Sequence, residues 1–379
     1  RLSDFVLTAD RFSQGDEVRR FEEQWSEWQG CKYSVFCNSG SSANFLIVQA
    51  MKELHSDTNH LWIAPATTWA TTVSPIMMSG QALQLCDVTI PNMNLCLDSF
   101  KEILYQHKRS FGARPKFLFL AHLLGFNSMS DELIHLCDEN NITILEDCCE
   151  SHGATYKDKM CGTLTEGSTF SFYFGHHMTT VEGGFVCTND DKLYNLMKMK
   201  RSHGMAREAT PENYKKYKQM YPEVHPMFMF ITDGYNLRSM ELNAVLGSSQ
   251  LKNLTKNNEI RKVNFNRFIR MVSKYPDLLF ANYKEEGNSS FCFPFICKSP
   301  EIKNHLEKYL SDNGVETRPL CSGNLLRQPF LQKDPKIPMP ERFPIAEALH
   351  KNGFFIGNNH MITEEDWVKL ETLLENYGR

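Results

Sequence analysis

The residues best suited to chemistry lie between 171 and 184, where the adjacent histidines His176 and His177 follow a short aromatic strand and precede Gly183-Gly184. An imidazole exchanges protons near neutral pH, so either histidine can act as a general acid or base. A metal site needs further ligands in suitable geometry, and we expect none here. The pattern indicates a histidine at a ligand-binding edge, with a structural histidine as the alternative.

A second group of polar residues follows the apolar run 142–145, where Glu146-Asp147 ends an expected strand. Open α/β sheets bind ligands at the carboxyl ends of their strands, and a carboxylate there can hold a proton on a heterocyclic nitrogen. Glu150 and His152 follow closely, which favours a polar cluster. A helix N-cap or a structural ion pair is the alternative for Asp147.

The segment 38–43, Asn-Ser-Gly-Ser-Ser-Ala, lies between an expected strand and an expected helix. Free backbone N–H groups, the helix dipole and small hydroxyl groups favour a phosphate in such a place. Gly40, Ser41 and Ser42 are therefore candidates for phosphate binding, and a plain turn is the alternative.

The elements that must position these groups alternate along the chain. Hydrophobic spacing predicts strands at 33–37, 61–64, 82–86, 117–121 and 142–146, and helices at 16–29, 43–51, 69–78, 97–105 and 131–139. Strands that alternate with helices are typical of an α/β fold with a mainly parallel sheet and helices on both faces.

The pattern changes near residue 239, where a long amphipathic helical stretch begins. We expect a large cofactor-binding domain at residues 1–250 and a smaller C-terminal α+β domain at residues 251–379. The polar segment 205–230 resembles an excursion that covers a site. Its Lys215 and Lys216 are candidates for binding a nucleotide diphosphate, and a solvated surface is the alternative.

Composition excludes several classes of protein. The 379 residues are 41% hydrophobic and 23% charged, which is typical of a folded protein. Lys and Arg number 41 against 45 Asp and Glu, a net charge of -4, so we expect no nucleic-acid polymer as partner. With no apolar run of about 20 residues and no apolar centre in the first twelve, we expect a cytoplasmic protein without a membrane anchor. The 12 cysteines lack the spacing of a zinc site and are expected as free, mostly buried thiols.

Together and in this order, these segments resemble the sugar aminotransferases of the DegT/DnrJ/EryC/StrS type, a group of fold type I pyridoxal phosphate (PLP) enzymes. The resemblance runs from Gly15-Asp16-Glu17-Val18 to Gly357-Asn358-Asn359, nearly the whole chain. By this resemblance, Gly40-Ser41-Ser42 would bind the cofactor phosphate together with Ser171. Trp69 would stack on the pyridine ring, Asp147 would pair with its nitrogen, and Glu150, where relatives commonly have Gln, would approach its hydroxyl group.

The resemblance also implies a homodimer. Asn236 and Arg238, in Gly-Tyr-Asn-Leu-Arg, look like the segment that reaches into the neighbouring subunit's site in this family. His203, in Arg-Ser-His-Gly-Met, also matches a segment near the site, with a supporting role implied.

One departure from the family pattern is decisive. Aligned on Ser-Phe…Lys…Glu-Gly-Gly, the position of the usual Schiff-base lysine is His176. The cofactor, PLP or pyridoxamine phosphate (PMP), would therefore be held without a covalent bond. Lys157 and Lys159 lie too far upstream to be obvious substitutes.

The same replacement, within Tyr-Phe-Gly-His-His-Met, resembles the 3-dehydratase branch of the family, which acts on GDP-4-keto-6-deoxy-D-mannose. The implied reaction has two halves. Glutamate, its carboxylate bound by Arg238, gives its amino group to PLP and leaves as 2-oxoglutarate. PMP then condenses with the C4 ketone of the sugar, His176 moves a proton, the C3 hydroxyl is expelled, and ammonia is released.

Three alternatives remain. A sugar aminotransferase could use another lysine. An iron-sulfur-dependent 3-dehydratase of CDP- or TDP-sugars would need more closely spaced thiols than Cys292, Cys297 and Cys321 provide. A catalytically silent relative would bind PLP or a nucleotide sugar, although it would have no chemical need for the complete set of site residues.

Overall fold

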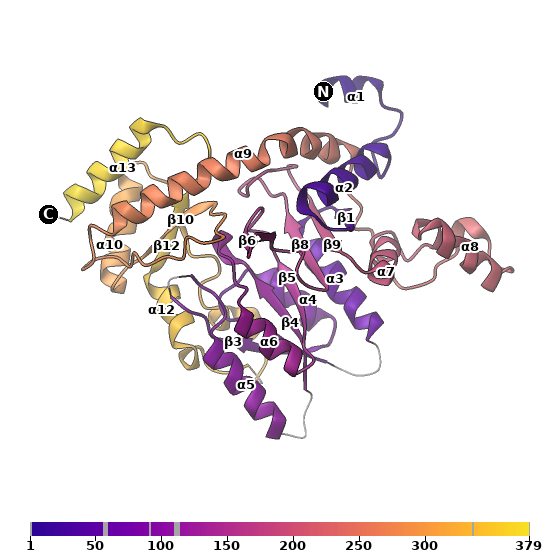
Figure 1. Ribbon diagram of the computed structural model, residues 1–379, viewed down its shortest axis with the longest axis horizontal. Coiled ribbons are helices and arrows are strands. Elements are labelled where there is room, and N and C mark those ends of the chain that lie inside the picture. The colour runs from indigo at the N-terminus through magenta and orange to yellow at the C-terminus, as the bar shows by residue number, and fades with distance from the viewer. Residues whose placement is uncertain (1, 56–59, 91, 110–113, 336, 379) are drawn as a thin grey trace.

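The computed structural model of the chain describes residues 2–55, 60–90, 92–109, 114–335 and 337–378, and contains a large and a small sheet (Figure 1). The strands are β1 (Tyr33–Cys37), β2 (Leu61–Pro65), β3 (Ala82–Cys86), β4 (Pro115–Ala121), β5 (Thr143–Asp147), β6 (Thr155–Tyr156), β7 (Lys159–Met160), β8 (Gly167–Ser171), β9 (Gly184–Thr188), β10 (Cys292–Ile296), β11 (Thr317–Pro319) and β12 (Gly353–Gly357).

Helices connect most of these strands. They are α1 (Leu2–Thr8), α2 (Asp16–Gln29), α3 (Gly40–Leu54), α4 (Ala70–Met78), α5 (Leu97–Arg109), α6 (Asp131–Glu139), α7 (Asp191–Arg201), α8 (Pro211–Met220), α9 (Glu241–Val272), α10 (Pro300–Asp312), α11 (Pro329–Gln332), α12 (Pro344–Asn352) and α13 (Glu364–Tyr377), with 3-10 turns at Leu123–Gly125, Ala206–Glu208, Pro226–Phe228, Leu325–Arg327 and Pro340–Arg342.

The large sheet has seven strands in the order β1-β9-β8-β5-β4-β2-β3. Strands β8, β5, β4, β2 and β3 pair in parallel, whereas β9 runs antiparallel to both of its neighbours, β1 and β8. The prediction of a mainly parallel sheet is confirmed. All strands except β9 therefore bring their carboxyl ends to one edge.

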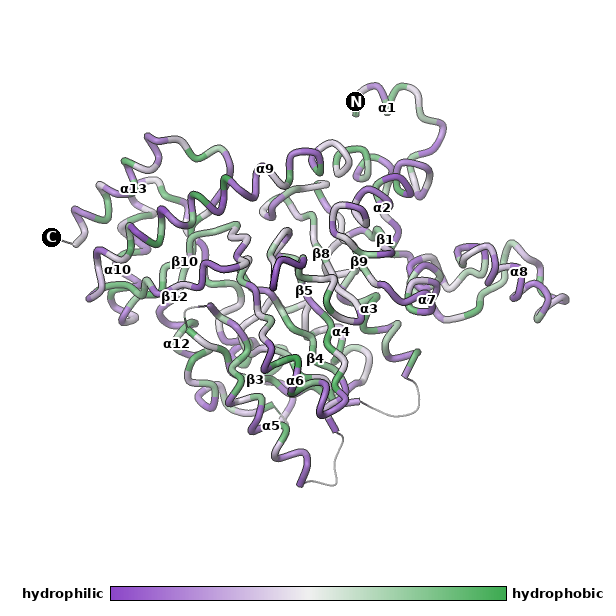
Figure 2. The backbone as a smooth tube through the Cα atoms, viewed as in Figure 1, coloured by the Kyte–Doolittle hydropathy of each residue, from purple (hydrophilic) through white to green (hydrophobic). Residues whose placement is uncertain are grey.

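Helices cover both faces of the large sheet, as predicted. Side chains of a strand alternate between faces, and in β4 Phe117 and Phe119 pack with α3 and α7, whereas Leu118 and Leu120 pack with α5 and α6. Figure 2 shows the hydrophobic colouring of β4 and β5 at the centre of the molecule. The sheet is thus buried on both sides, which leaves its carboxyl edge as the place for a site.

The start of α3 differs from the prediction. The sequence pattern predicts a helix from residue 43, but α3 begins at Gly40 because the Ser39 side chain accepts a hydrogen bond from Ser42 N and caps the helix. The Gly40-Ser41-Ser42 segment is therefore the first turn of a helix rather than a loop before it.

The small sheet, in the order β10-β12-β11, packs with the C-terminal half of α9 and with α13. Phe268 of α9 stacks on Phe293 of β10 at 4.9 Å between ring centroids. The expected division after residue 250 falls inside α9, which runs unbroken from the large sheet to the small one. The ends of the two expected domains, residues 1 and 379, lie outside the described residues.

The excursion at 205–230 projects from the side of the molecule opposite the small sheet (Figure 1). Its central helix, α8, buries none of its residues, and Met227, Phe228 and Phe230 after it are exposed. Among the described residues, no helix is long and apolar enough to cross a membrane.

Candidate active site

Asp147 lies at the carboxyl end of β5, as predicted, and β5 is the middle strand of the large sheet. Its Oδ2 atom accepts hydrogen bonds from Asn44 Nδ2 at 2.9 Å and Thr72 Oγ1 at 2.8 Å, and its Oδ1 atom accepts one from Cys149 N at 3.1 Å. Thr169 of β8 in turn donates to Asn44 Oδ1 at 2.6 Å. These donors fix the carboxylate in one orientation, which would suit a charge that pairs with a ligand.

The first turn of α3 faces Ser171, the last residue of β8. A Cβ atom at Gly40 would lie 2.4 Å from Ser171 Cβ, so the helix start approaches the strand end closely. Ser41 Oγ donates to Thr71 Oγ1 at 3.2 Å. Backbone N–H groups at a helix start and small hydroxyl groups together form a binding site for a phosphate, and the structure brings the predicted residues to one place.

The Gly40→Ala substitution tests this close approach. The added methyl group would have to displace Ser171, so we expect a loss of about 1–3 kcal/mol in the free energy of unfolding and weaker binding of PLP. Denaturant unfolding and a PLP titration measure the two effects. Gly357→Ala is the matched control, because a Cβ atom there has no neighbour within 4 Å. Equal PLP affinity in Gly40→Ala and the parent protein would contradict this assignment.

Trp69 is the N-cap of α4, and 54% of its surface is exposed, so its indole is free to cover a ligand ring.

Glu150 follows β5 and is partly buried. Its Oε2 atom accepts a hydrogen bond from Leu124 N at 2.8 Å, and the Cys321 thiol lies 3.4 Å from Oε1. Burial raises the pKa of Glu150 to about 7, so this carboxyl can carry a proton at neutral pH.

His176 lies in the turn after β8, where its backbone N–H donates to Tyr173 O at 3.0 Å. Its Nδ1 atom is buried and has no hydrogen-bond partner among the described residues. Burial lowers the pKa of His176 to about 4, so the ring is neutral at pH 7 and can accept a proton. His177 is different, because its Nε2 atom bonds to Ser289 O at 2.7 Å within the core.

The lysines upstream of this turn do not supply an amine to it. Lys157 lies at a surface hairpin and bonds to both carboxylate oxygens of Asp131, at 2.6 and 2.7 Å. Lys159 is exposed on β7. The segment 167–184 itself contains no lysine.

The segment with Asn236 and Arg238 runs beside the end of β1. Leu237 O accepts a hydrogen bond from Asn38 N at 3.0 Å, and Arg238 Nη2 lies 3.4 Å from His203 Nε2. His203 has φ of 63°, a left-handed conformation that is rare for residues other than glycine. The structure therefore joins Asn236, Arg238 and His203 next to the start of α3.

The other two predicted residues, Lys215 and Lys216, lie elsewhere. They belong to α8, which projects far from the carboxyl end of β5 in Figure 1. Within one chain they are thus separate from Asp147, and their role in substrate binding stays a prediction.

A buried group behind Asp147, formed by His122, Glu146 and Cys148, has the composition of a metal site. Ser128 N donates to His122 Nδ1 at 3.0 Å, so the opposite ring nitrogen carries the proton and donates to Glu146 at 2.9 Å. Both ring nitrogens of His122 are thereby engaged in hydrogen bonds, which leaves neither of them to bind a metal ion. We interpret this group as a structural support for the end of β5.

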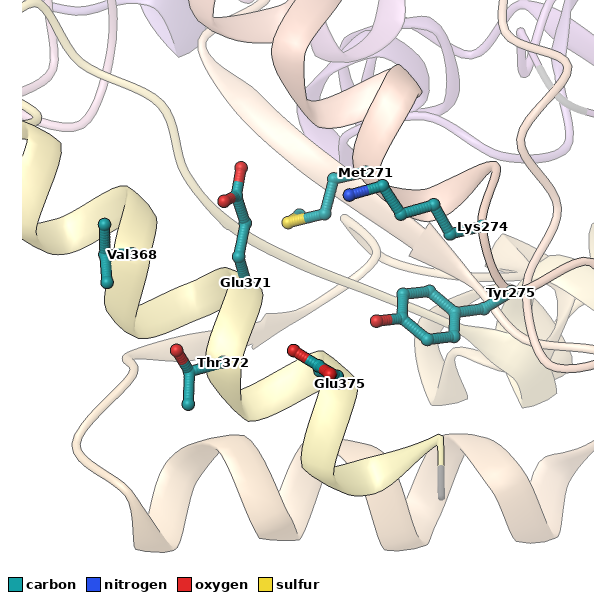
Figure 3. Close-up of a pocket in the computed structure, with 7 residues that line it drawn as sticks. All are labelled: Met271, Lys274, Tyr275, Val368, Glu371, Thr372 and Glu375. Carbon is teal, nitrogen blue, oxygen red and sulfur yellow. The ribbon is translucent and has the colours of Figure 1, made fainter.

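A hollow of about 480 Å³ lies between the end of α9 and α13 (Figure 3). Lys274, Glu371 and Glu375 are among the side chains that line it. It contains neither a predicted site residue nor an imidazole or thiol, so the candidate site remains at the carboxyl edge of the large sheet.

Sequence reasoning missed the residues that hold Asp147, namely Asn44, Thr72 and Thr169. A weak signal was present, since Asn44 and Thr72 lie one helical turn after Gly40 and Trp69 and so occupy the same helix faces. Cys321 was also missed, because it reaches Glu150 from a segment 171 residues away.

Comparisons with known proteins show which family the chain resembles. The model of the DegT/DnrJ/EryC1/StrS aminotransferase family matches residues 3–372. The GDP-4-keto-6-deoxy-D-mannose 3-dehydratase of Escherichia coli O55:H7 is 32% identical over 372 residues, which cover 96% of this chain and 94% of that protein. The protein of the same name from Yersinia pseudotuberculosis is 31% identical over 376 residues, with coverage of 98% and 93%. A crystal structure of GDP-4-keto-6-deoxymannose-3-dehydratase with a trapped PLP-glutamate geminal diamine matches with a TM-score of 0.85 and 29% identity, and covers 98% of this chain and 96% of that one.

Proposed function

The chain belongs to the DegT/DnrJ/EryC1/StrS aminotransferase family, and we propose that it removes the C3 hydroxyl of GDP-4-keto-6-deoxy-D-mannose with PLP and PMP as cofactor. Glutamate supplies the amino group, and 2-oxoglutarate and ammonia leave. The two relatives carry the name of this reaction, and the solved structure holds PLP with glutamate. The fold is the expected α/β fold of type I PLP enzymes.

The residues at the carboxyl edge fit PLP. The start of α3 and Ser171 would bind its phosphate, Trp69 would cover the ring, and Asp147 would keep a proton on the pyridine nitrogen. When bound, PLP would supply the aldehyde that receives the amino group of glutamate, and as PMP it would supply an amine for the C4 ketone and a ring that withdraws electrons. Glu150, with its pKa raised to about 7, would give or share a proton at the ring hydroxyl.

One observation favours dehydration over transfer of an amino group to the sugar. The position of the usual lysine holds His176, whose ring is neutral and partly buried, in a segment without lysine. An imidazole can take a proton and return it but cannot hold the cofactor covalently. His176 would therefore move the proton that accompanies the loss of the C3 hydroxyl, and the cofactor would stay bound through its phosphate, its ring face and its nitrogen.

Substrate contacts are proposed for the segment beside the start of α3. Arg238 would bind a carboxylate of glutamate, and His203 supports it through the 3.4 Å contact between the two side chains. Lys215 and Lys216 would meet the diphosphate of the nucleotide sugar, from the neighbouring subunit, since α8 projects away from the site of its own chain.

We also propose a homodimer with a shared site. Large apolar side chains on either side of His176 are exposed, among them Phe174 at 60% and Val181 at 64%. A second copy of the chain would cover them, and sedimentation of the purified protein as a monomer would contradict this arrangement.

All 12 cysteines are free thiols, as expected, which supports a reducing, cytoplasmic location.

The alternatives fit less well. An aminotransferase would need an amine at the site, but Lys157 is engaged at the surface by Asp131. An iron-sulfur cluster would need its thiolates close together, yet Cys292 begins the extended strand β10 and Cys297 directly follows its last residue, roughly 16 Å apart at about 3.3 Å per residue. A silent relative would have no use for the fixed orientation of Asp147.

The direct test combines purified protein with PLP, glutamate and GDP-4-keto-6-deoxymannose, and follows ammonia together with the mass of the sugar product. We expect ammonia and a sugar that has lost one oxygen. An amino sugar without ammonia would identify an aminotransferase. Dependence on an added reductase, with brown protein, would identify the iron-sulfur alternative, and no turnover would favour the silent relative.

A further inference from the structure

The carboxyl group of Glu150 accepts hydrogen bonds from two segments that come from different parts of the fold. Leu124, in the turn after β4, donates its backbone N–H to Oε2 at 2.8 Å. Cys321, in the loop after β11 of the small sheet, places its thiol 3.4 Å from Oε1 and 3.5 Å from Oε2. A carboxyl of the large domain is thus held in part by a side chain of the small one.

Both partners adopt a backbone conformation that is unfavourable for their residue types. Leu124 has φ of 54° and Cys321 has φ of 45°, in the left-handed region that favours glycine. Residues other than glycine persist there only where the surrounding structure holds them, and such residues cluster at functional sites. Two residues with strained backbone conformations, from separate segments, therefore contact the same carboxyl group, that of Glu150.

The loop that carries Cys321 is fastened to the wall of the site. The hydroxyl of Ser322 donates to Thr68 O, next to Trp69. Leu325 N donates to Ala66 O at 2.9 Å. The position of the Cys321 thiol is therefore tied to the segment that precedes Trp69.

We propose that Cys321 is a positioning residue whose thiol, together with the Leu124 N–H, orients the Glu150 carboxyl toward the cofactor and sets the pH at which this carboxyl ionises. The inference rests on the proposed function, because it takes the ring hydroxyl of PLP as the group that Glu150 faces. The thiol donates a hydrogen bond to the carboxylate and so favours its charged form. Loss of this donor shifts the ionisation of Glu150 to higher pH.

Among the other titratable groups that interact with Glu150, Asp147 opposes its ionisation and the thiols are neutral. Burial raises the pKa of Glu150, and the negative charge of Asp147 at the end of β5 raises it further. Within the described part of the chain, the thiols of Cys149 and Cys292 also interact with Glu150; their pKa values are raised well above the ordinary range, so both are neutral. Leu124 and Cys321 are thus the groups that favour ionisation of Glu150.

The test follows the absorbance of PLP bound to the full-length protein as a function of pH, because ionisation beside the ring hydroxyl changes the spectrum. For Cys321→Ala we expect a midpoint raised by about 0.5–1 pH unit, a threefold to tenfold change in the ionisation constant. Cys321→Ser, which restores a donor, should return the midpoint to within about 0.5 unit of the parent value. The same shift should appear in the pH profile of kcat/KM for dehydration.

Two controls separate this role from a general effect on folding. Cys96→Ala removes another partly buried thiol, one whose backbone bonds to Asp87, and should leave the midpoint unchanged. Glu150→Gln should abolish the transition, and Cys321→Ala added to it should cause no further change. An unshifted midpoint in Cys321→Ala, or a shift that persists in the Glu150→Gln background, would overturn the proposal. The spectral readout needs only bound PLP, so a protein that shows the shift but no dehydration would contradict the proposed function alone.

Discussion

The His176→Lys variant is expected to hold PLP covalently and to lose dehydration. Burial lowers the pKa of the imidazole at this position to about 4. The same burial would disfavour the charged form of a lysine, so its amine would be neutral and nucleophilic. The amine attacks the aldehyde carbon of PLP and one water molecule leaves, which links cofactor and protein. Dehydration should fall by roughly 10²–10⁴-fold, the usual contribution of a positioned acid-base group.

Borohydride reduction followed by mass spectrometry detects the link, and release of ammonia measures dehydration. His176→Asn should lose dehydration without gaining the link, which separates loss of the imidazole from gain of the amine. Lys157→Ala is the matched lysine control and should behave as the parent protein, since Lys157 pairs with Asp131 at the surface. Dehydration at the parent rate in His176→Lys would show that His176 is not the proton-transfer group.

The sequence was sufficient to predict those parts of the fold that depend on local pattern. The helix at 131–139 and the strands at 33–37 and 82–86 have the predicted bounds, because strong apolar periodicity and clear end signals coincide there. The start of α3 was predicted three residues late, because the cap is a side-chain hydrogen bond of Ser39 and not a change in hydrophobicity. The position of β9 as an antiparallel strand inside the sheet depends on long-range pairing, which no local pattern specifies.

In the site, too, features that follow from local sequence could be predicted, and features that depend on long-range contacts could not. Gly40 and Asp147 could be proposed because one lies between a strand and a helix, the other ends a strand, and the carboxyl ends of parallel strands meet at one edge. Ser171, and the choice of His176 over His177, depended on the resemblance to the family. The residues that hold these side chains in place could not be predicted. Thr169, for example, supports Asp147 only through Asn44, and both hydrogen bonds join segments that are distant in the sequence. Cys321 reaches Glu150 only once the segment after β11 is packed against the end of β5.

The second large effect is expected for Asp147→Asn. Both carboxylate oxygens accept hydrogen bonds, Oδ2 from Asn44 and Thr72 and Oδ1 from Cys149. An amide can place its oxygen toward Asn44 and Thr72, but its NH₂ group then faces the N–H of Cys149. The variant also lacks the negative charge that, by the proposed function, would keep the pyridine nitrogen protonated. Removing one partner of a buried charge pair costs about 3–5 kcal/mol, so we expect dehydration to slow by roughly 10²–10⁴-fold.

This result has to be separated from a loss of structure or of cofactor. The rate of dehydration is therefore measured at saturating PLP, and bound PLP is measured by absorbance in the same samples. Asp131→Asn is the matched control, because Asp131 is an exposed carboxylate whose partner is Lys157 at the surface. We expect it to keep the parent rate, since exposed ion pairs contribute little. If Asp147→Asn retains more than about one fifth of the parent rate, less than 1 kcal/mol of the barrier depends on the charge, and the carboxylate only supports the fold of the site.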